Sequence, residues 1–182
     1  ASFPEPADPL GFAAGLPAAF LVLVAVFFAV VTGGRAMRIF LAGIMQGSHV
    51  AALVHDQTYR ERFRRAVEDR WPEAEVYDPH ANHANSIGYG VDQARKVFVG
   101  HVEMCREFDL LVAYVPEASM GTAIEMWEAH RHGRVVVTIT PLVHNWVVQL
   151  TSHAVYRDFD TFLHALEAGE IDALVSSERR EA

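Results

Sequence analysis

Asp109-Leu-Leu-Val-Ala-Tyr-Val115, followed by Pro-Glu-Ala-Ser119-Met-Gly121-Thr-Ala-Ile-Glu125, is the stretch that decides the fold. The first part is apolar and rich in strand-forming residues, which predicts a buried strand. The second part is a turn of small residues, and a helix is expected from residue 122 to residue 132, closed by Gly133. A strand that ends in such a turn and opens a helix exposes backbone N–H groups that bind anions. The stretch therefore predicts a strand–turn–helix unit with a binding corner.

The rest of the chain repeats this alternation of strands and helices. Strands are expected at 38–42, 75–78, 109–115, 134–140 and 154–156, and helices at about 50–70, 91–107, 122–132, 142–152 and 158–168. The pattern predicts an α/β fold with a doubly wound parallel sheet of about five strands and helices on both faces. Such folds bind ligands at the carboxyl ends of the strands. The candidate binding loops are therefore 43–48, 78–90, 115–125 and 140–146.

Composition narrows the class of protein. A length of 182 residues favours one domain, and the formal charge of −8 argues against nucleic-acid binding. Cys105 is the one cysteine, so no intramolecular disulfide can form, which favours a reducing, cytoplasmic environment. A small anionic ligand remains compatible with the charge, because a few backbone amides can hold one phosphate.

The first 36 residues differ in composition from the remainder of the chain. Residues 16–32 contain no charged side chain, so about 12–32 form a candidate transmembrane helix at the lower limit of length. Arg35 and Arg38 come after it, which would leave the remainder in the cytoplasm. The alternative is that 1–36 is an upstream extension of a soluble catalytic domain at 37–182.

Glu125 has two interpretations. Thr122-Ala-Ile-Glu125 matches a capping box, in which the carboxylate only satisfies a backbone amide. Alternatively, the helix N-terminus favours an ionised carboxylate that could attack an electrophilic carbon. Ser119 and Gly121 would present a hydroxyl and amides to an anion, or would simply form a tight turn.

The segments Ile39-Phe-Leu-Ala-Gly43, 109–115 and Ser119-Met-Gly-Thr-Ala-Ile-Glu125-Met resemble the nucleoside 2-deoxyribosyltransferase family. That family also includes N-glycosidases that hydrolyse nucleoside 5′-monophosphates, and the resemblance covers about 37–166. It implies a flavodoxin-like domain that cleaves the bond between sugar and base without a cofactor. Glu125 matches the family's nucleophile, which forms a covalent glycosyl intermediate at C1′ before a second base or water releases it.

The resemblance also distinguishes between substrates. Ser119 stands where the transferases hold an aspartate and the monophosphate hydrolases a serine, which favours a 5′-monophosphate because a carboxylate would repel it. The loop with Gly43, Gln46, Gly47 and Ser48 would supply further contacts to phosphate or sugar. Gln46 departs from the basic residue that some hydrolases carry there, which counts against the phosphate.

Three further polar residues are candidates because of their positions. His101 falls where the family usually has an aspartate, and it would either protonate the departing base or have no role. His80 is expected to contact base or sugar, whereas its segment, Asp78 to His83, matches no zinc signature. Asn145 lies where family members lend a polar residue to the neighbouring subunit, which implies a homodimer or higher oligomer.

Near the first helix, Tyr59 is expected in the core, and Arg60 and Asp56 are expected in solvent.

The sequence therefore predicts an N-glycosidase acting on a nucleoside or deoxynucleoside 5′-monophosphate through Glu125. Base exchange between deoxynucleosides is the nearest alternative. A catalytically silent nucleotide sensor, tethered through residues 16–32 or free, is the alternative from another class. Cleavage of a dinucleotide such as NAD has no separate feature in its favour.

Overall fold

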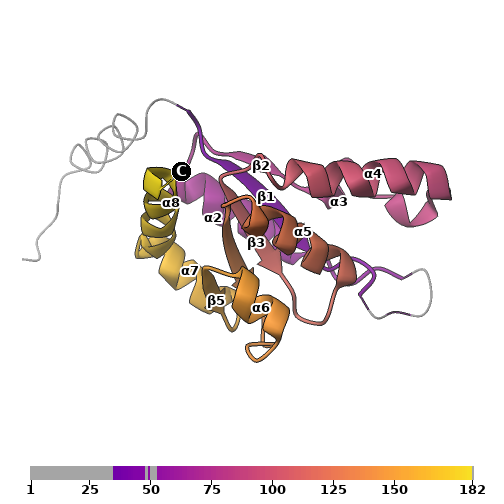
Figure 1. The fold of residues 1–182 in the computed structure, drawn as a ribbon. Helices are drawn as coiled ribbons and strands as arrows, with labels where there is room; N and C mark the ends of the chain where they lie inside the picture. The colour runs from indigo at the N-terminus through magenta and orange to yellow at the C-terminus, as the bar shows by residue number, and fades with distance from the viewer. Residues whose placement is uncertain (1–34, 48, 50–52, 182) are drawn as a thin grey trace, which may run out of the picture. The chain divides into compact units, whose positions relative to one another are not determined.

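The sheet contains five parallel strands in the order β2-β1-β3-β4-β5 in the computed structural model, which describes residues 35–47, 49 and 53–181 (Figure 1). The strands are β1 (Arg38–Gly43), β2 (Glu75–Tyr77), β3 (Leu110–Tyr114), β4 (Val135–Ile139) and β5 (Ala154–Tyr156). All four neighbouring pairs run parallel. This order is that of flavodoxin-like folds, with the reversal between β1 and β3. The predicted fold class is confirmed.

Alternate residues of the central strands pack on opposite faces of the sheet, because successive side chains of a strand point in opposite directions. Ile39 and Leu41 belong to one buried cluster, and Phe40 and Ala42 belong to the other. Continuous apolar strands such as β3 and β4 are the consequence of a sheet covered on both faces.

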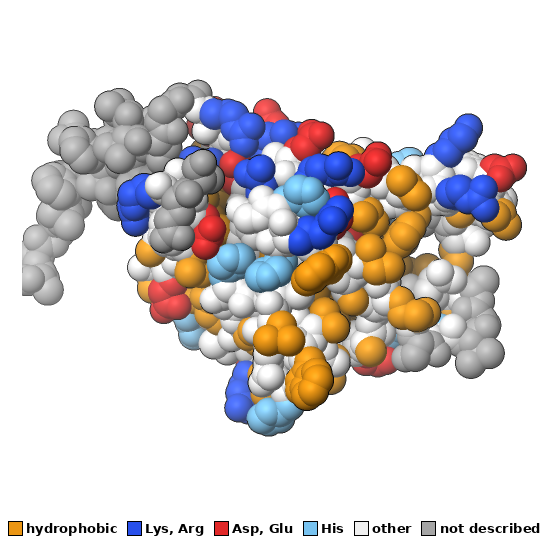
Figure 2. Space-filling view, viewed as in Figure 1, with side chains coloured by type: hydrophobic (Ala, Val, Ile, Leu, Met, Phe, Trp, Pro, Cys, Tyr) orange, Lys and Arg blue, Asp and Glu red, His pale blue; other side chains and the backbone are white. Residues whose placement is uncertain are grey.

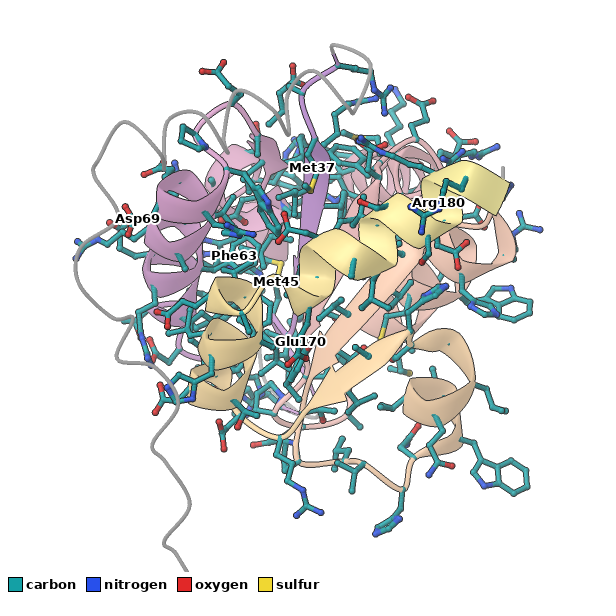
Figure 3. All side chains as sticks on the ribbon, turned by 90° about the vertical axis from the view of Figure 1, so that its left-hand side faces the viewer. Met37, Met45, Phe63, Asp69, Glu170 and Arg180 are labelled. Carbon is teal, nitrogen blue, oxygen red and sulfur yellow. The ribbon has the colours of Figure 1, made fainter. Side chains whose placement is uncertain are left out.

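Helices α2 (Tyr59–Arg70), α7 (Phe159–Glu167) and α8 (Glu170–Glu181) cover one face. Figure 3 shows these three helices in front of the sheet, with Phe63 on the inner side of α2 and Asp69 on its outer side. Phe63 stacks on Phe162 of α7 with ring centroids 6.0 Å apart. Ile171 and Val175 of α8 complete this cluster.

Helix α5 (Met120–Arg131) covers the other face, and α4 (Val91–Met104) and α6 (Trp146–Thr151) pack against α5. Met126 and Ala129 of α5 pack there against Cys105 and Phe108, which come after α4. Between β2 and α4 the chain forms a short helix, α3 (Pro79–Asn82), and one 3₁₀ turn, η1 (Ser86–Gly88).

Several helix boundaries differ from the predicted ones. The helix expected from about residue 50 begins at Tyr59, after a turn in which Asp56 accepts hydrogen bonds from the Thr58 N–H and hydroxyl. The segment 80–90, expected to be a loop, contains α3, because the Asp78 carboxylate caps it by accepting from the N–H of His80 at 2.9 Å. Helix α8 was not predicted, and it begins after Gly169, whose φ of 79° ends α7.

No helix within the described part of the chain is long and apolar enough to cross a membrane. The candidate span at about 12–32 lies outside the described residues, as does Ser48. The extension at 1–36, its membrane anchor, the domain at 37–182 and the cytoplasmic location therefore stay predictions.

Candidate active site

A cavity of about 440 Å³ opens at the carboxyl ends of β1 and β3, where the strand order reverses. Its walls come from the loop after β1, from the segment between β2 and α4, from α4 and from the first turns of α5. Its lining includes Gly43, Gln46, Gly47, Arg60, His83, Ile87, Tyr89, Ala94, Val97, Phe98, His101, Ser119, Met120, Gly121, Ile124 and Glu125. This is the edge at which such folds bind ligands.

The structure brings together most of the residues singled out in the sequence. Seven of them line this one cavity: Gly43, Gln46, Gly47, His101, Ser119, Gly121 and Glu125. His80 and Asn145 are not among the lining residues. These seven residues come from the end of β1 and the loop after it, from α4 and from the segment after β3, and the alternation of strands and helices predicted that the two loops share one edge of the sheet.

Glu125 is buried in the cavity wall, with 9% of its surface exposed. Desolvation raises its pKa to about 8, and the nearby positive charge of Arg60 opposes that rise. The expectation that the helix N-terminus keeps this carboxylate ionised is wrong, because burial outweighs that effect. Glu125 is the sixth residue of α5, and the field of a helix terminus falls off within the first turn.

The capping-box interpretation of Glu125 is also wrong. The N-cap of α5 is Ser119, whose hydroxyl oxygen accepts from the Thr122 N–H at 3.4 Å and shares a 2.9 Å hydrogen bond with the Thr122 hydroxyl. The helix begins at Met120 rather than residue 122, so Glu125 lies too far along it to reach the cap. Its carboxyl group has no capping function and faces the cavity.

Arg60 is buried, with 6% exposure, which corrects the prediction that it is solvated. Its Nη1 donates to Asp78 Oδ1 at 2.6 Å in a buried ion pair, and its Nε donates to Gln57 Oε1 at 2.6 Å. Asp78 comes after β2 at the same edge of the sheet, and that position was the one signal in the sequence for this pair. The guanidinium places a fixed positive charge at the wall that holds Glu125.

Gly43 forms the floor of the cavity because no larger residue fits there. A Cβ atom at this position would lie 2.0 Å from Tyr59 Oη and 3.3 Å from Arg60 Nη2. Tyr59 is a core residue, as predicted, and its ring stacks on Tyr114 with centroids 4.1 Å apart. Within the described residues its hydroxyl is buried without a hydrogen-bond partner.

His101 and His83 lie side by side at the cavity wall, with ring centroids 5.2 Å apart. His101 Nε2 is 3.1 Å from the hydroxyl of Tyr77, and burial, followed by the neighbouring His83, lowers the pKa of His101 to about 4. His83 Nδ1 is 3.1 Å from the hydroxyl of Tyr89. The sequence pointed to His80 instead of His83, because it gave no sign of the short helix α3, after which His83 lies at the cavity wall.

The other predicted positions have local roles. His80 donates its backbone N–H to Asp78, and its side chain does not line the cavity. Asn145 is the exposed N-cap of α6, and its side-chain oxygen accepts from the Val147 N–H at 2.9 Å. In the described ranges no group of three or more His, Cys, Asp or Glu side chains could hold a metal ion.

No protein-family model matches the chain, and no curated protein sequence matches it. Among solved structures, a 2-deoxyribosyltransferase from Bacillus psychrosaccharolyticus matches with a TM-score of 0.53 and 17% identity, over 69% of this chain and 90% of its own. A conserved protein from Enterococcus faecalis V583 matches with a TM-score of 0.54 and 17% identity, over 74% and 99%. A CMP N-glycosidase from Clostridium botulinum matches more loosely, with a TM-score of 0.41 and 20% identity, over 72% and 98%. The first two likenesses show a shared fold.

Proposed function

We propose that this chain is an N-glycosidase of the nucleoside 2-deoxyribosyltransferase type, acting on a nucleoside or deoxynucleoside 5′-monophosphate. The observation that carries the proposal is a buried glutamate, Glu125, in a cavity at the carboxyl ends of β1 and β3. The fold shared with a 2-deoxyribosyltransferase supports it. The same fold hosts unrelated functions, so the residues of the site must support the activity by their own chemistry.

Glu125 would act as the nucleophile. Its ionised carboxylate bonds to C1′ of the sugar while the electron pair of the C1′–N bond goes to the base. Water then attacks C1′ and releases the carboxylate. Arg60 favours the ionised form that this attack needs, and burial disfavours it. The attack therefore proceeds from the minor fraction of molecules in which Glu125 is ionised. The low polarity of the surroundings strengthens the interaction between the carboxylate and the positive charge developing on the sugar.

A 5′-monophosphate fits the corner between Gly43 and Gly121 better than a free hydroxyl would. Ser119 lines this corner with a hydroxyl group and no charge, and the first N–H groups of α5 have no partner within the helix. Gln46 and Gly47 line the same cavity after β1. In the family that the sequence resembles, the transferases hold an aspartate where Ser119 stands, and this resemblance favours hydrolysis over base exchange.

The test is incubation of the full chain with a panel of nucleosides and their 5′-monophosphates, with base release measured chromatographically. Release should be lost in Glu125→Gln and kept in Glu117→Gln, which changes an exposed carboxyl in the loop before α5. Product that forms only when a second free base is present would establish the transferase instead. Nucleotide binding without any release would establish a sensor and refute the proposal.

We further propose that the site is completed by a second copy of the chain. Hydrophobic side chains gather over α5 and α6 (Figure 2), and among them Met120 is 83% and Trp146 is 78% exposed. Met120 and Ile124 also line the cavity, so this surface continues into the site. Asn145 lies at the start of α6, within the same surface. Light scattering should detect a dimer or larger oligomer that Trp146→Glu dissociates; a wild-type monomer with full activity would refute this.

A further inference from the structure

We propose that His83, rather than His101, is the catalytic acid that protonates the departing base. The inference rests on the proposed function, because it assigns the second proton-handling group of the same cavity. Two histidines line the site, and each has a tyrosine hydroxyl at 3.1 Å. They differ in which nitrogen is engaged and in how deeply each ring is buried.

His83 is engaged through Nδ1, by the Tyr89 hydroxyl. In the protonated ring Nδ1–H donates to that hydroxyl, which fixes the ring and leaves Nε2–H as the proton that can be given away. No hydrogen bond within the described residues uses Nε2 of His83. His83 is half-buried and lines the cavity, so its ring is within reach of a bound molecule.

His101 is engaged through the opposite ring nitrogen. Its Nε2 is engaged by Tyr77, its ring is buried, and it makes a T-shaped contact with the ring of Phe40, with centroids 6.3 Å apart. With its pKa lowered to about 4, only about one ring in a thousand carries the extra proton at pH 7. A neutral His101 therefore places no positive charge beside the ring of His83.

The wall around His83 suits a planar base. Ile87, Ala94 and Val97 provide apolar surface from η1 and α4, and Tyr89 adds an aromatic ring. The amide-bearing corner for the phosphate lies on other elements, after β1 and β3. A nucleotide whose C1′ faces Glu125 would therefore direct its base toward the wall that carries His83.

The proposed step balances in protons and electrons. A Glu125 carboxylate oxygen bonds to C1′, the C1′–N electron pair goes to the base nitrogen, and His83 Nε2 transfers its proton to the base. Neutral His83 then accepts a proton from the water that attacks C1′, and Glu125 leaves as a carboxylate. Both side chains return to their starting forms, and no further reactant is needed.

The experiment compares two leaving groups. One substrate is the ordinary nucleoside 5′-monophosphate that the wild type cleaves fastest, and the other is 7-methylguanosine 5′-monophosphate in ribo and deoxy forms, whose cationic base leaves without being protonated. His83→Gln should slow the ordinary substrate by about 10²- to 10⁴-fold. It should leave the rate with the methylated substrate nearly unchanged, because that base needs no proton to leave. His164→Gln, which removes an exposed imidazole of α7 on the opposite face of the sheet, should slow neither.

A second measurement applies even if the methylated substrate is not accepted. The profile of kcat/KM against pH should lose its alkaline limb in His83→Gln and keep it in His164→Gln. The titratable groups that face His83 are Tyr89 and His101, and Arg60 and Glu125 line the same cavity. Tyr89→Phe, which removes the hydroxyl on Nδ1, should slow the ordinary substrate more than the methylated one.

The two proposals fail in different ways. If the wild type releases no base from any substrate, the proposed function is refuted and the role of His83 with it. The other case is that the wild type and His164→Gln are active and Glu125→Gln is inactive. If His83→Gln then slows both leaving groups equally, or keeps the alkaline limb, only the assignment of His83 is refuted. Circular dichroism and thermal unfolding of each variant separate lost chemistry from lost folding.

Discussion

Replacing Glu125 by glutamine should make the protein more stable, and increasingly so as the pH rises. The Glu125 carboxyl has a pKa of about 8 in the folded protein, against an ordinary value of 4.5. Between these values the folded state binds a proton that the unfolded state has released, so the free energy of unfolding of the wild type falls as the pH rises. This free energy falls by about 1.4 kcal/mol for each pH unit, and the total decrease between the two pKa values is on the order of 5 kcal/mol.

The assay is urea denaturation of the wild type and Glu125→Gln at several values from pH 5 to pH 9. The difference in unfolding free energy between the two should widen up to about pH 8 and stay constant above it. Taking this difference cancels the titration of every other group. Glu117→Gln, which alters an exposed carboxyl nearby, should show a difference that does not change with pH. A constant difference for Glu125→Gln would show that the buried carboxyl is already ionised at pH 5, and the assigned effect of burial would be refuted.

Three further predictions concern the floor and the corner of the cavity. Arg60→Met leaves Asp78 buried without its partner and should reduce the unfolding free energy by about 3 to 5 kcal/mol, as measured by thermal and urea unfolding. A loss below about 1 kcal/mol, which is the range of an exposed ion pair, would contradict this. Gly43→Ala brings Cβ within 2.0 Å of Tyr59 Oη and should abolish activity and lower stability, and adding Tyr59→Phe should restore part of both; no gain from the second substitution would exclude this hydroxyl as the obstacle. Ser119→Ala removes the cap of α5 and should lower the unfolding free energy by about 1 kcal/mol. Ser119→Thr keeps a hydroxyl and should retain most of the wild-type stability. Equal losses for the two variants in urea unfolding would show that the cap contributes nothing.

The sequence was sufficient for a parallel sheet with helices on both faces and for the edge of the sheet at which the cavity opens. Alternating apolar strands and amphipathic helices indicated a parallel sheet, and the turn after residue 115 indicated the edge at which Glu125 lies. These features depend on local periodicity and on rules of chain connection, which a single sequence carries.

The features that were missed depend on contacts between distant segments. Arg60 looks like a surface residue among the charged side chains of α2, and only its meeting with Asp78, 18 positions later, buries it. The start of α5 was misplaced because Ser119 and Thr122 are both good N-cap residues, and the sequence does not say which one the chain uses. His83 reaches the cavity through α3, a helix of four residues that is too short to show a periodic pattern.

The floor of the cavity at Gly43 is backed by a helix from the far side of the sheet. Tyr59 and Arg60 are consecutive residues of α2, and the same helix anchors the opposite core through Phe63 and Val67. Any repacking of that core that slides or rotates α2 will therefore shift the guanidinium near the buried carboxyl of Glu125. Variants selected for altered turnover should accordingly include substitutions on the buried side of α2, out of reach of any bound nucleotide.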